Sequence, residues 1–246
     1  MNTLIKPVPP GGTIGIVGGG QLGRMLAMAA ARLGLNACIF NDAPDAPAFQ
    51  VTAHHMVAAY DDIAALEAFA ARCDAVTFEF ENLPAHAIAR LADLVWVAPS
   101  ARALAVTQDR LSEKSFIAGL GLKTAPFREV SSPDQARGAF ADLGGGPAIL
   151  KTRRFGYDGK GQAEVRGAAS CAAAFDGFKG APAILEGFVD FAFEASVVAA
   201  RGRGGAFAAY DPPENLHEHH ILRRSTVPGR LTAQQGQAAK DIAKTI

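Results

Sequence analysis

Hydrophobic and polar residues follow two different periods over the first hundred positions of the chain. Short apolar runs bounded by turn residues predict strands, at residues 13–19, 36–40, 74–80 and 95–99. Apolar residues at helical spacing predict helices between them, at residues 21–33, 61–73 and 83–94. Strands and helices that alternate in this way favour a parallel sheet covered by helices. The sequence therefore predicts an α/β fold for this part of the chain.

The pattern changes after Pro99. Helical spacing, with capping residues at several ends, predicts further helices, at residues 101–122, 132–144, 168–178 and 232–246. Strands are predicted at residues 147–152 and 182–189, and residues 191–210 are typical of a β-hairpin that turns at Gly202 to Gly205. The loss of strict alternation indicates that a different kind of domain begins here.

The charge balance gives no reason to expect a nucleic acid or an anionic membrane as partner, because 24 basic and 24 acidic side chains cancel. Any phosphate-bearing ligand must then be met by a local group of positive charges. Cys38, Cys73 and Cys171 show no CxxC spacing, and we expect free thiols in a reducing compartment. No apolar run reaches the ~18 residues of a membrane helix, so we expect a soluble cytoplasmic protein.

Residues 18–23, Gly-Gly-Gly-Gln-Leu-Gly, fit the spacing G-x-G-x-x-G between a predicted strand and a predicted helix. Glycines there let the backbone approach an anion, and the start of the helix offers N–H groups to a phosphate. Three interpretations stay open: a turn that needs glycine for its geometry alone, a dinucleotide site, or a site for another phosphate. A dinucleotide site also needs an acid at the end of the second strand, and Asp42 lies near that position in a proline-bearing loop.

Two further segments place chemically useful groups at predicted strand ends. Glu79 and Glu81 occupy alternate positions of the third strand, so they share one face, either at a ligand-binding edge of the sheet or in solvent. Lys151 closes a strand and precedes residues 156–161, which contain three glycines and two charges. Such a loop can wrap its N–H groups around phosphates, and a simple turn is the alternative.

Two glutamates and a histidine-rich segment complete the candidates. Glu186 and Glu194 are either acceptors for a ribose or an adenine amine or exposed strand residues. A polar loop is predicted around Asn215, His217, His219 and His220. Zinc is disfavoured there, because no cysteine or second set of ligands accompanies the histidines. The loop then either contacts a substrate or nucleotide or has no function.

Six segments of the chain, taken in order, carry a resemblance to a known family. They are GIVGGGQLGRMLAMAA, TFEFENLP, QDRLSEKSF, ILKTRRFGYDGKGQ, ILEGFVDFAFEASVVAAR and PPENLHEHHILRRSTVPG. Together they resemble 5-(carboxyamino)imidazole ribonucleotide synthetase, also called the ATPase subunit of phosphoribosylaminoimidazole carboxylase, of the ATP-grasp superfamily. The resemblance runs from about Thr13 to the last residue, and the pair FEFEN and GYDGKGQ is its most specific part.

The resemblance implies a fold in three parts. A Rossmann-like pre-ATP-grasp domain with a parallel sheet would occupy residues 1–103. An ATP-grasp module would follow, with its linker helix, small lobe and glycine-rich flap in residues 104–187 and the first part of its large lobe in residues 188–246. Members of the family continue past the position of Ile246 into a set of magnesium ligands. We therefore expect a module truncated at its C-terminal end, with no metal ligands in this chain and little turnover by the chain alone.

The resemblance also implies a reaction and its site. ATP, with Mg, would drive the carboxylation of aminoimidazole ribonucleotide by bicarbonate through carboxyphosphate, in a protein that is a homodimer at full length. The implied nucleotide contacts are Arg110, Lys151, Gly156, Tyr157, Asp158, Gly159, Lys160, Gly161, Gln162, Glu186, Val189, Glu194 and His217. The implied ribonucleotide contacts are Gly20, Gln21, Leu22, Glu79, Glu81, Tyr157, Asp158 and Lys160. Catalytic roles would fall to Lys151, Lys160, Tyr157 and Asp158.

Three alternatives to this reading follow from the same residues. Another ATP-grasp ligase, such as a formyltransferase or a biotin carboxylase relative, would share the lysine and the glycine-rich loop but would not need FEFEN together with GYDGKGQ. A dinucleotide-binding oxidoreductase rests on residues 18–23 alone. A nucleotide-binding fragment without activity would differ from the synthetase only in lacking turnover.

Overall fold

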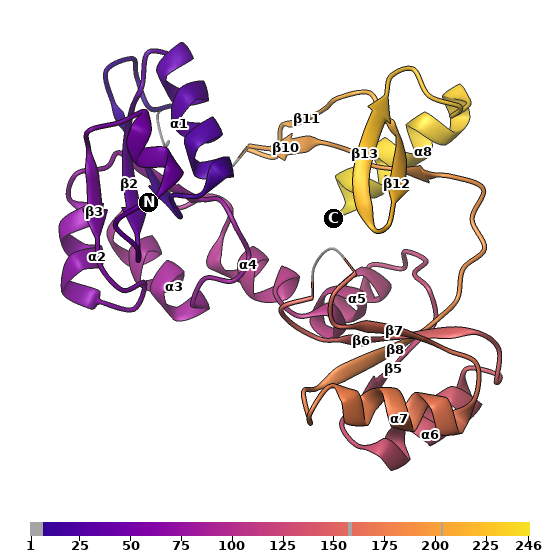
Figure 1. Ribbon diagram of the computed structural model, residues 1–246. Helices are drawn as coiled ribbons and strands as arrows, with labels where there is room; N and C mark the ends of the chain where they lie inside the picture. Colours follow the sequence, from indigo (N-terminus) through magenta and orange to yellow (C-terminus); the bar gives the residue numbers. More distant parts are fainter. Residues whose placement is uncertain (1–6, 157–158, 203) are drawn as a thin grey trace. The chain divides into compact units, whose positions relative to one another are not determined.

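The computed structural model describes residues 7–156, 159–202 and 204–246, and the chain divides into two compact units (Figure 1). The first unit is Met1–Gln108 and the second is Asp109–Ile246. The finer division into parts that end at residues 103 and 187 stays a prediction. Within the described residues, none of the helices combines the length and the apolar character that a membrane crossing requires.

The first unit is built on a parallel sheet, as the alternating pattern predicted. Its strands are β1 (Thr13–Val17), β2 (Asn36–Asn41), β3 (His55–Val57) and β4 (Ala75–Phe78), in the order β3-β2-β1-β4. The short strand β3 was not predicted, because three residues are too few to show a period. The predicted strand at 95–99 is wrong: Val97 forms only an isolated bridge to Val76.

Helices cover both faces of this sheet because successive strand residues point to opposite sides. On one face Phe40 and Val76 pack with α2 (Ile63–Ala70), α3 (Ala85–Leu94) and α4 (Ala101–Thr107). On the other face Ile39 packs with α1 (Gln21–Arg32) and the short 3-10 helix η1 (Pro47–Gln50). The sheet therefore has a core on each side, which holds the loops at its carboxyl edge in place.

The single helix predicted at 101–122 is wrong. The structure has two helices, α4 and α5 (Arg110–Gly119), with separate caps. Ser100 caps the first, and the Asp109 carboxylate accepts the N–H groups of Leu111 and Ser112 at the start of the second. Apolar spacing continues through 108–109, so the break depends on a capping aspartate within the pattern rather than on a glycine or proline.

The second unit begins with an antiparallel sheet. Its strands are β5 (Phe127–Val130), β6 (Ala148–Thr152), β7 (Gln162–Val165) and β8 (Ala183–Gly187), in the order β5-β8-β6-β7. Helices α6 (Pro133–Asp142) and α7 (Ala168–Gly177) lie along one face, as Figure 1 shows, and bury Leu150 and Leu185 with Phe140 and Phe175. The other face stays available for polar side chains, because α6 and α7 bury only one side of the sheet.

The rest of the second unit corrects two predictions. Residues 191–210 do not form one hairpin: β10 (Ala199–Arg201) and β11 (Phe207–Ala209) pair around the predicted turn, but β9 (Glu194–Ala195) pairs with β12 (Glu214–Glu218). The segment predicted as a histidine-rich loop is instead a hairpin of β12 with β13 (Ile221–Thr226). Helix α8 (Ala233–Thr245) follows and confirms the helix predicted there.

The β12–β13 hairpin escaped prediction for two physical reasons. Every residue of β13 is exposed, so the strand shows no alternation of apolar and polar positions. Its turn is made by His219 and His220, with φ angles of 51° and 64°. These left-handed angles normally select glycine or asparagine, which is the signal that a hairpin search uses.

Candidate functional site

The second unit carries a charged cluster on the sheet face opposite α6 and α7. In this antiparallel sheet Glu186 lies directly opposite Ile149, and Lys151 lies directly opposite Ile184. Opposite residues share a face, so Lys151 and Glu186 are diagonal neighbours on it. The Nζ atom of Lys151 lies 2.8 Å from Oε2 of Glu186. Because Glu186 is only 7% exposed, the interpretation of it as an exposed strand residue is wrong.

A second lysine, which the sequence did not single out, joins this pair. Lys114 on α5 places its Nζ atom 3.5 Å from the same Oε2 of Glu186 and 5.9 Å from the ring centre of Phe127. Phe127 is the residue opposite Glu186 on the neighbouring strand. Lys114 could not be predicted, because its place depends on how α5 packs on the sheet and not on a local motif.

The charged cluster and burial also shift the pKa of the neighbouring Glu113. Burial raises the pKa of Glu113 above its usual value, while the charges of Arg110 and Lys114 lower it and that of Glu186 raises it. The net shift of this pKa is upward, so burial disfavours the charged form of Glu113 in spite of the two neighbouring cations.

The start of the glycine-rich loop is fixed to the start of α5. The Arg110 guanidinium donates to the carbonyl oxygen of Gly156 at 3.0 Å, and the Arg110 N–H donates to the carbonyl oxygen of Arg153 at 3.0 Å. At the other end of the loop, Thr152 N–H donates to the carbonyl oxygen of Gly161 at 2.8 Å. The implied contacts Tyr157 and Asp158 lie outside the described residues. Lys160 lies within the same loop.

Two ion pairs of Arg153 fix the end of β6 to the start of α5 and to β5. Arg153 contacts the carboxylate of Asp109 at 2.8 Å and that of Glu129 at 2.7 Å. Burial raises the pKa of Asp109, but hydrogen bonds from Ser112 N–H, Arg153 and Leu111 N–H lower the pKa by more, so it lies below its usual value. The Asp109 carboxylate therefore both caps α5 and holds the strand end beyond Lys151.

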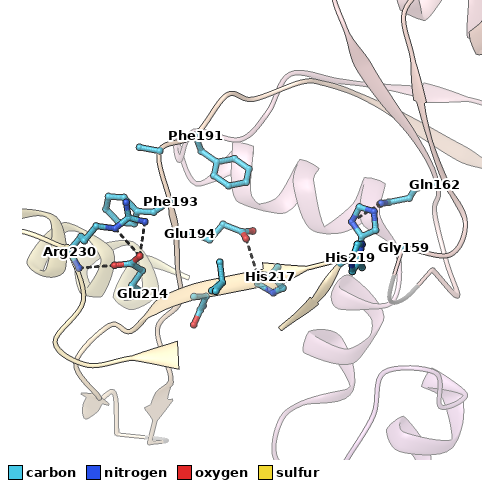
Figure 2. A pocket seen from close by; sticks show the side chains of 13 residues that line it. Gly159, Gln162, Phe191, Phe193, Glu194, Glu214, His217, His219 and Arg230 are labelled. Atoms are coloured by element: carbon cyan, nitrogen blue, oxygen red, sulfur yellow. Dashed lines mark hydrogen bonds and ion pairs between the residues drawn. The ribbon is translucent and has the colours of Figure 1, made fainter. Parts of the chain in front are cut away.

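A pocket of about 700 Å³ lies in the second unit (Figure 2), between the β7 end of this sheet and the β9–β12 strands. Glu194 and His217 point toward each other in it, with Oε2 and Nδ1 at 2.7 Å. Gln162 also lines the pocket and is paired directly with Lys151 in the sheet. Through Gln162, the sheet face that bears Lys151 and Glu186 adjoins the pocket that holds Glu194 and His217, although neither Lys151 nor Glu186 lines the pocket. Val189, the remaining implied contact, follows β8 and is exposed.

The far wall of the pocket brings the β12–β13 turn against the glycine-rich loop. Nδ1 of His220 lies 3.4 Å from Nε2 of Gln162. A Cβ atom at Gly159 would lie 2.6 Å from Cδ2 of His220, and the φ angle of Gly159 is +79°. The left-handed backbone conformation favours glycine there, and a Cβ atom would also push the His220 side chain from its present position. The histidine-rich segment is therefore part of the site's wall, which the sequence left open.

The glycine turn of the first unit has its own arrangement. Gly19 N–H donates to Oδ1 of Asn41 at 2.8 Å, and Gly20 N–H donates to Oε1 of Glu79 at 2.9 Å. Gln21 and Leu22 begin α1 with exposed side chains. The side-chain oxygens of Asn41 and Glu79 thus show that the turn presents its N–H groups to oxygen acceptors.

Two expectations about this turn need correction. Strand β4 ends at Phe78, so Glu79 and Glu81 lie in the loop after it and strand alternation does not place them on one face. The residue at the end of β2 is the buried Asn41, which also accepts a hydrogen bond from Tyr60 at 2.9 Å. Asp42, the expected acid of a dinucleotide site, follows one position later. The carbonyl of Glu81 accepts a hydrogen bond from the buried Gln108 at 2.6 Å.

Within residues 7–156, 159–202 and 204–246, no three or more His, Cys, Asp or Glu side chains come close enough together to hold a metal ion.

Comparison with known domain families assigns the class. Residues 12–108 match the ribonucleotide synthetase pre-ATP-grasp domain, and residues 115–246 match the ATP-grasp domain. The second match alone covers more than half of the chain, and the chain belongs to the ATP-grasp family. This confirms the predicted order of a pre-ATP-grasp domain and an ATP-grasp module.

The relatives narrow the class further. The chain is 48% identical over 239 residues to N5-carboxyaminoimidazole ribonucleotide synthase of Brucella melitensis, covering 96% of this chain and 66% of the relative. It is 36% identical over 234 residues to the enzyme of the same name from Bacillus subtilis, covering 95% of this chain and 61% of the relative. The chain thus spans less than two thirds of the length of these relatives. Their names confirm the family resemblance drawn from the sequence.

Solved structures agree with this assignment. The ADP complex of an N5-carboxyaminoimidazole ribonucleotide synthetase has a TM-score of 0.88 at 38% identity, covering 97% of this chain and 63% of that one. The Aspergillus clavatus enzyme, in complex with ADP and 5-aminoimidazole ribonucleotide, has a TM-score of 0.86 at 26% identity, covering 96% and 62%.

Proposed function

We propose that this chain belongs to an enzyme that carboxylates 5-aminoimidazole ribonucleotide at the expense of ATP. Bicarbonate supplies the carbon, and the products are 5-(carboxyamino)imidazole ribonucleotide, ADP and phosphate, in purine biosynthesis. The names of the relatives and the fungal complex with ADP and 5-aminoimidazole ribonucleotide support the proposal. The observation that carries it is the Lys151–Glu186 ion pair next to Gln162, which lines the pocket that contains the Glu194–His217 pair.

The nucleotide occupies the second unit in this proposal. A triphosphate needs positive charge and N–H donors, which Lys151, Arg110 and the glycine-rich loop at 156–162 supply. Glu194 and His217 offer an acceptor and a ring nitrogen for ribose hydroxyl groups. Glu186 and Val189 lie at the end of β8, where the backbone can meet the adenine edge. From the family resemblance, Tyr157, Asp158 and Lys160 are assigned contacts with the nucleotide and with the ribonucleotide.

The ribonucleotide occupies the first unit. Its phosphate binds at Gly20, Gln21 and Leu22, where the start of α1 offers N–H groups and the positive end of the helix dipole. Glu79 accepts the Gly20 N–H in the structure, so a phosphate there takes the place of that carboxylate. Glu79 and Glu81 are then free to contact the ribose and the imidazole amine.

The chemistry proceeds in two balanced steps. A bicarbonate oxygen attacks the γ-phosphorus of ATP, which releases ADP and forms carboxyphosphate. The amine of the ribonucleotide then attacks the carboxyl carbon, phosphate leaves, and the nitrogen loses one proton. The chain contributes charge on the transferring phosphoryl group, mainly from Lys151, and a covered site that keeps water from the acyl phosphate. Magnesium is part of the proposal, but we assign it no ligands and no step, because the described residues form no metal cluster.

The remaining features of the proposal concern the whole protein. We propose a cytoplasmic homodimer that takes small-molecule substrates, with neither nucleic acid nor membrane as partner. The balanced charge of the chain supports this choice of partners.

The test is a coupled assay of ADP release by the complete gene product that contains this chain. ADP release is expected only when bicarbonate and 5-aminoimidazole ribonucleotide are both present, with ¹³C from labelled bicarbonate found in the product. Equal stimulation by an unrelated amine or carboxylate would contradict the assignment and favour another ATP-grasp ligase.

A further inference from the structure

Lys114 is the one member of the charged cluster to which the proposed function gives no role. It lies on α5, outside the glycine-rich loop and outside the strands, and its side chain is 18% exposed. Its ammonium is 3.5 Å from the Glu186 oxygen that also contacts Lys151 at 2.8 Å. Two cations therefore share a single oxygen of one buried carboxylate.

This sharing has an energetic consequence. A buried carboxylate without a cationic partner costs several kcal/mol or changes its protonation. With Lys151 as the sole partner, Glu186 would hold that lysine tightly, because the departure of Lys151 would leave the carboxylate either uncompensated or forced to take up a proton. A lysine that binds a phosphate must be able to leave its resting partner, and a second cation at Glu186 lowers the cost of this exchange.

We infer that Lys114 is a positioning residue of the nucleotide site, which keeps Glu186 compensated while Lys151 turns to the phosphates of the nucleotide. The inference rests on the proposed function, since it assigns Lys151 to a phosphate. Lys114 itself does not contact the nucleotide in this account. The ring of Phe127, 5.9 Å from its Nζ atom, holds the ammonium in place as a cation–π partner.

The geometry distinguishes Lys114 from a lysine that only stabilises the fold. Glu186 is on a central strand, between β5 and β6, and its carboxylate is reached from the sheet by Lys151 and from a helix by Lys114. When Lys151 leaves, the helix-borne lysine stays. Loss of Lys114 should therefore affect the binding of phosphate groups more than the binding of a nucleoside.

The experiment compares ADP and adenosine binding by calorimetry in the 246-residue chain and its variants. Lys114→Met is expected to weaken ADP binding about tenfold, which corresponds to about 1.4 kcal/mol of binding free energy. The affinity for adenosine should stay within about twofold of that of the unaltered chain. Lys114→Arg keeps the charge and should restore ADP binding. Lys123→Met removes an exposed lysine after α5 and serves as the matched control, with unchanged ADP binding.

A second pair of variants separates compensation of Glu186 from general damage. In a Glu186→Gln background the neutral amide needs no cation, so adding Lys114→Met should change ADP affinity by less than about twofold. Thermal unfolding of each variant shows that it is folded. The inference is overturned if Lys114→Met binds ADP like the unaltered chain, if it weakens ADP and adenosine equally, or if its effect persists with Gln at 186. No ADP binding by the unaltered chain would instead contradict the assignment of the nucleotide site to the second unit, on which the inference rests.

Discussion

Gly23 offers a test of how tightly the glycine turn of the first unit is built. It lies inside α1 and is buried. Helix propensity alone favours Gly23→Ala by about 1 kcal/mol. However, a Cβ atom on Gly23 would lie 2.4 Å from the carbonyl oxygen of Gly18. That oxygen cannot move freely, because Gly18 has a φ of +102° and its N–H donates to Phe40 at 2.8 Å.

The steric effect should win over the propensity. Overpacking of a buried site costs typically about 1–3 kcal/mol, so we expect Gly23→Ala to lower the free energy of unfolding by about 1–2 kcal/mol. Gly138 in α6 is the matched control: it is exposed, and no atom lies within 4 Å of a Cβ built on it. Gly138→Ala should gain about 0.5–1 kcal/mol from propensity alone.

The assay uses the only tryptophan of the chain. Trp96 lies in the first unit, so its fluorescence in a urea titration follows the unit that contains Gly23, while far-UV circular dichroism follows both units. Gly23→Ala should lower the fluorescence midpoint. Gly138→Ala should leave the fluorescence midpoint unchanged and shift to higher urea the part of the dichroism transition that the fluorescence does not follow. A fluorescence midpoint for Gly23→Ala at or above that of the unaltered chain would refute the reasoning.

Three further predictions concern the second unit. Lys151→Ala should weaken ADP binding by about 1.5–3 kcal/mol, the scale of hydrogen bonds to charged groups, and equal affinity by calorimetry would show that the lysine has no part in the site. The pKa of Asp109 is lowered, so its charge contributes stability above the unfolded-state pKa of 3.8, and this contribution is lost as pH falls through the folded-state pKa. Asp109→Asn should therefore be less stable than the unaltered chain at pH 7 and lose this difference in acid; a gap in melting temperature that does not shrink toward pH 3 would contradict this. Burial raises the pKa of Glu113 above 4.5, so the protonated side chain contributes stability below pH 4.5, and this contribution is lost as the pH rises through the folded-state pKa. Glu113→Gln should therefore have a higher melting temperature than the unaltered chain at pH 7. A lower melting temperature there would argue against burial as the cause of the raised pKa.

The fold of the first unit could be predicted because its strands and helices are long enough to show their periods. Phe40 and Ile39 sit on opposite faces of β2, each buried, which is the pattern that a doubly covered sheet produces. The errors were local. Strand β2 runs one residue further than expected, to Asn41, and so an amide rather than the acid of Asp42 closes it.

The candidate site could be predicted only where a local motif marks it. Lys151 and the glycine-rich loop stand out in the sequence, and Glu186 ends an apolar strand. Lys114 has no such mark, because its role comes from the packing of α5 on the sheet. The β12–β13 hairpin brings His217 to Glu194. It could not be predicted, because its strands are held by backbone pairing and show no alternation of apolar and polar residues.

The claim that ADP binds in the second unit, rather than at the glycine turn of the first, can be measured directly. Hydrogen exchange of the 246-residue chain with and without ADP should show slower exchange in β6, β8 and β12, around Lys151, Glu186 and His217, and unchanged exchange at residues 18–23. Slower exchange at residues 18–23 with no change in the second unit would contradict the account and would favour a dinucleotide type of site.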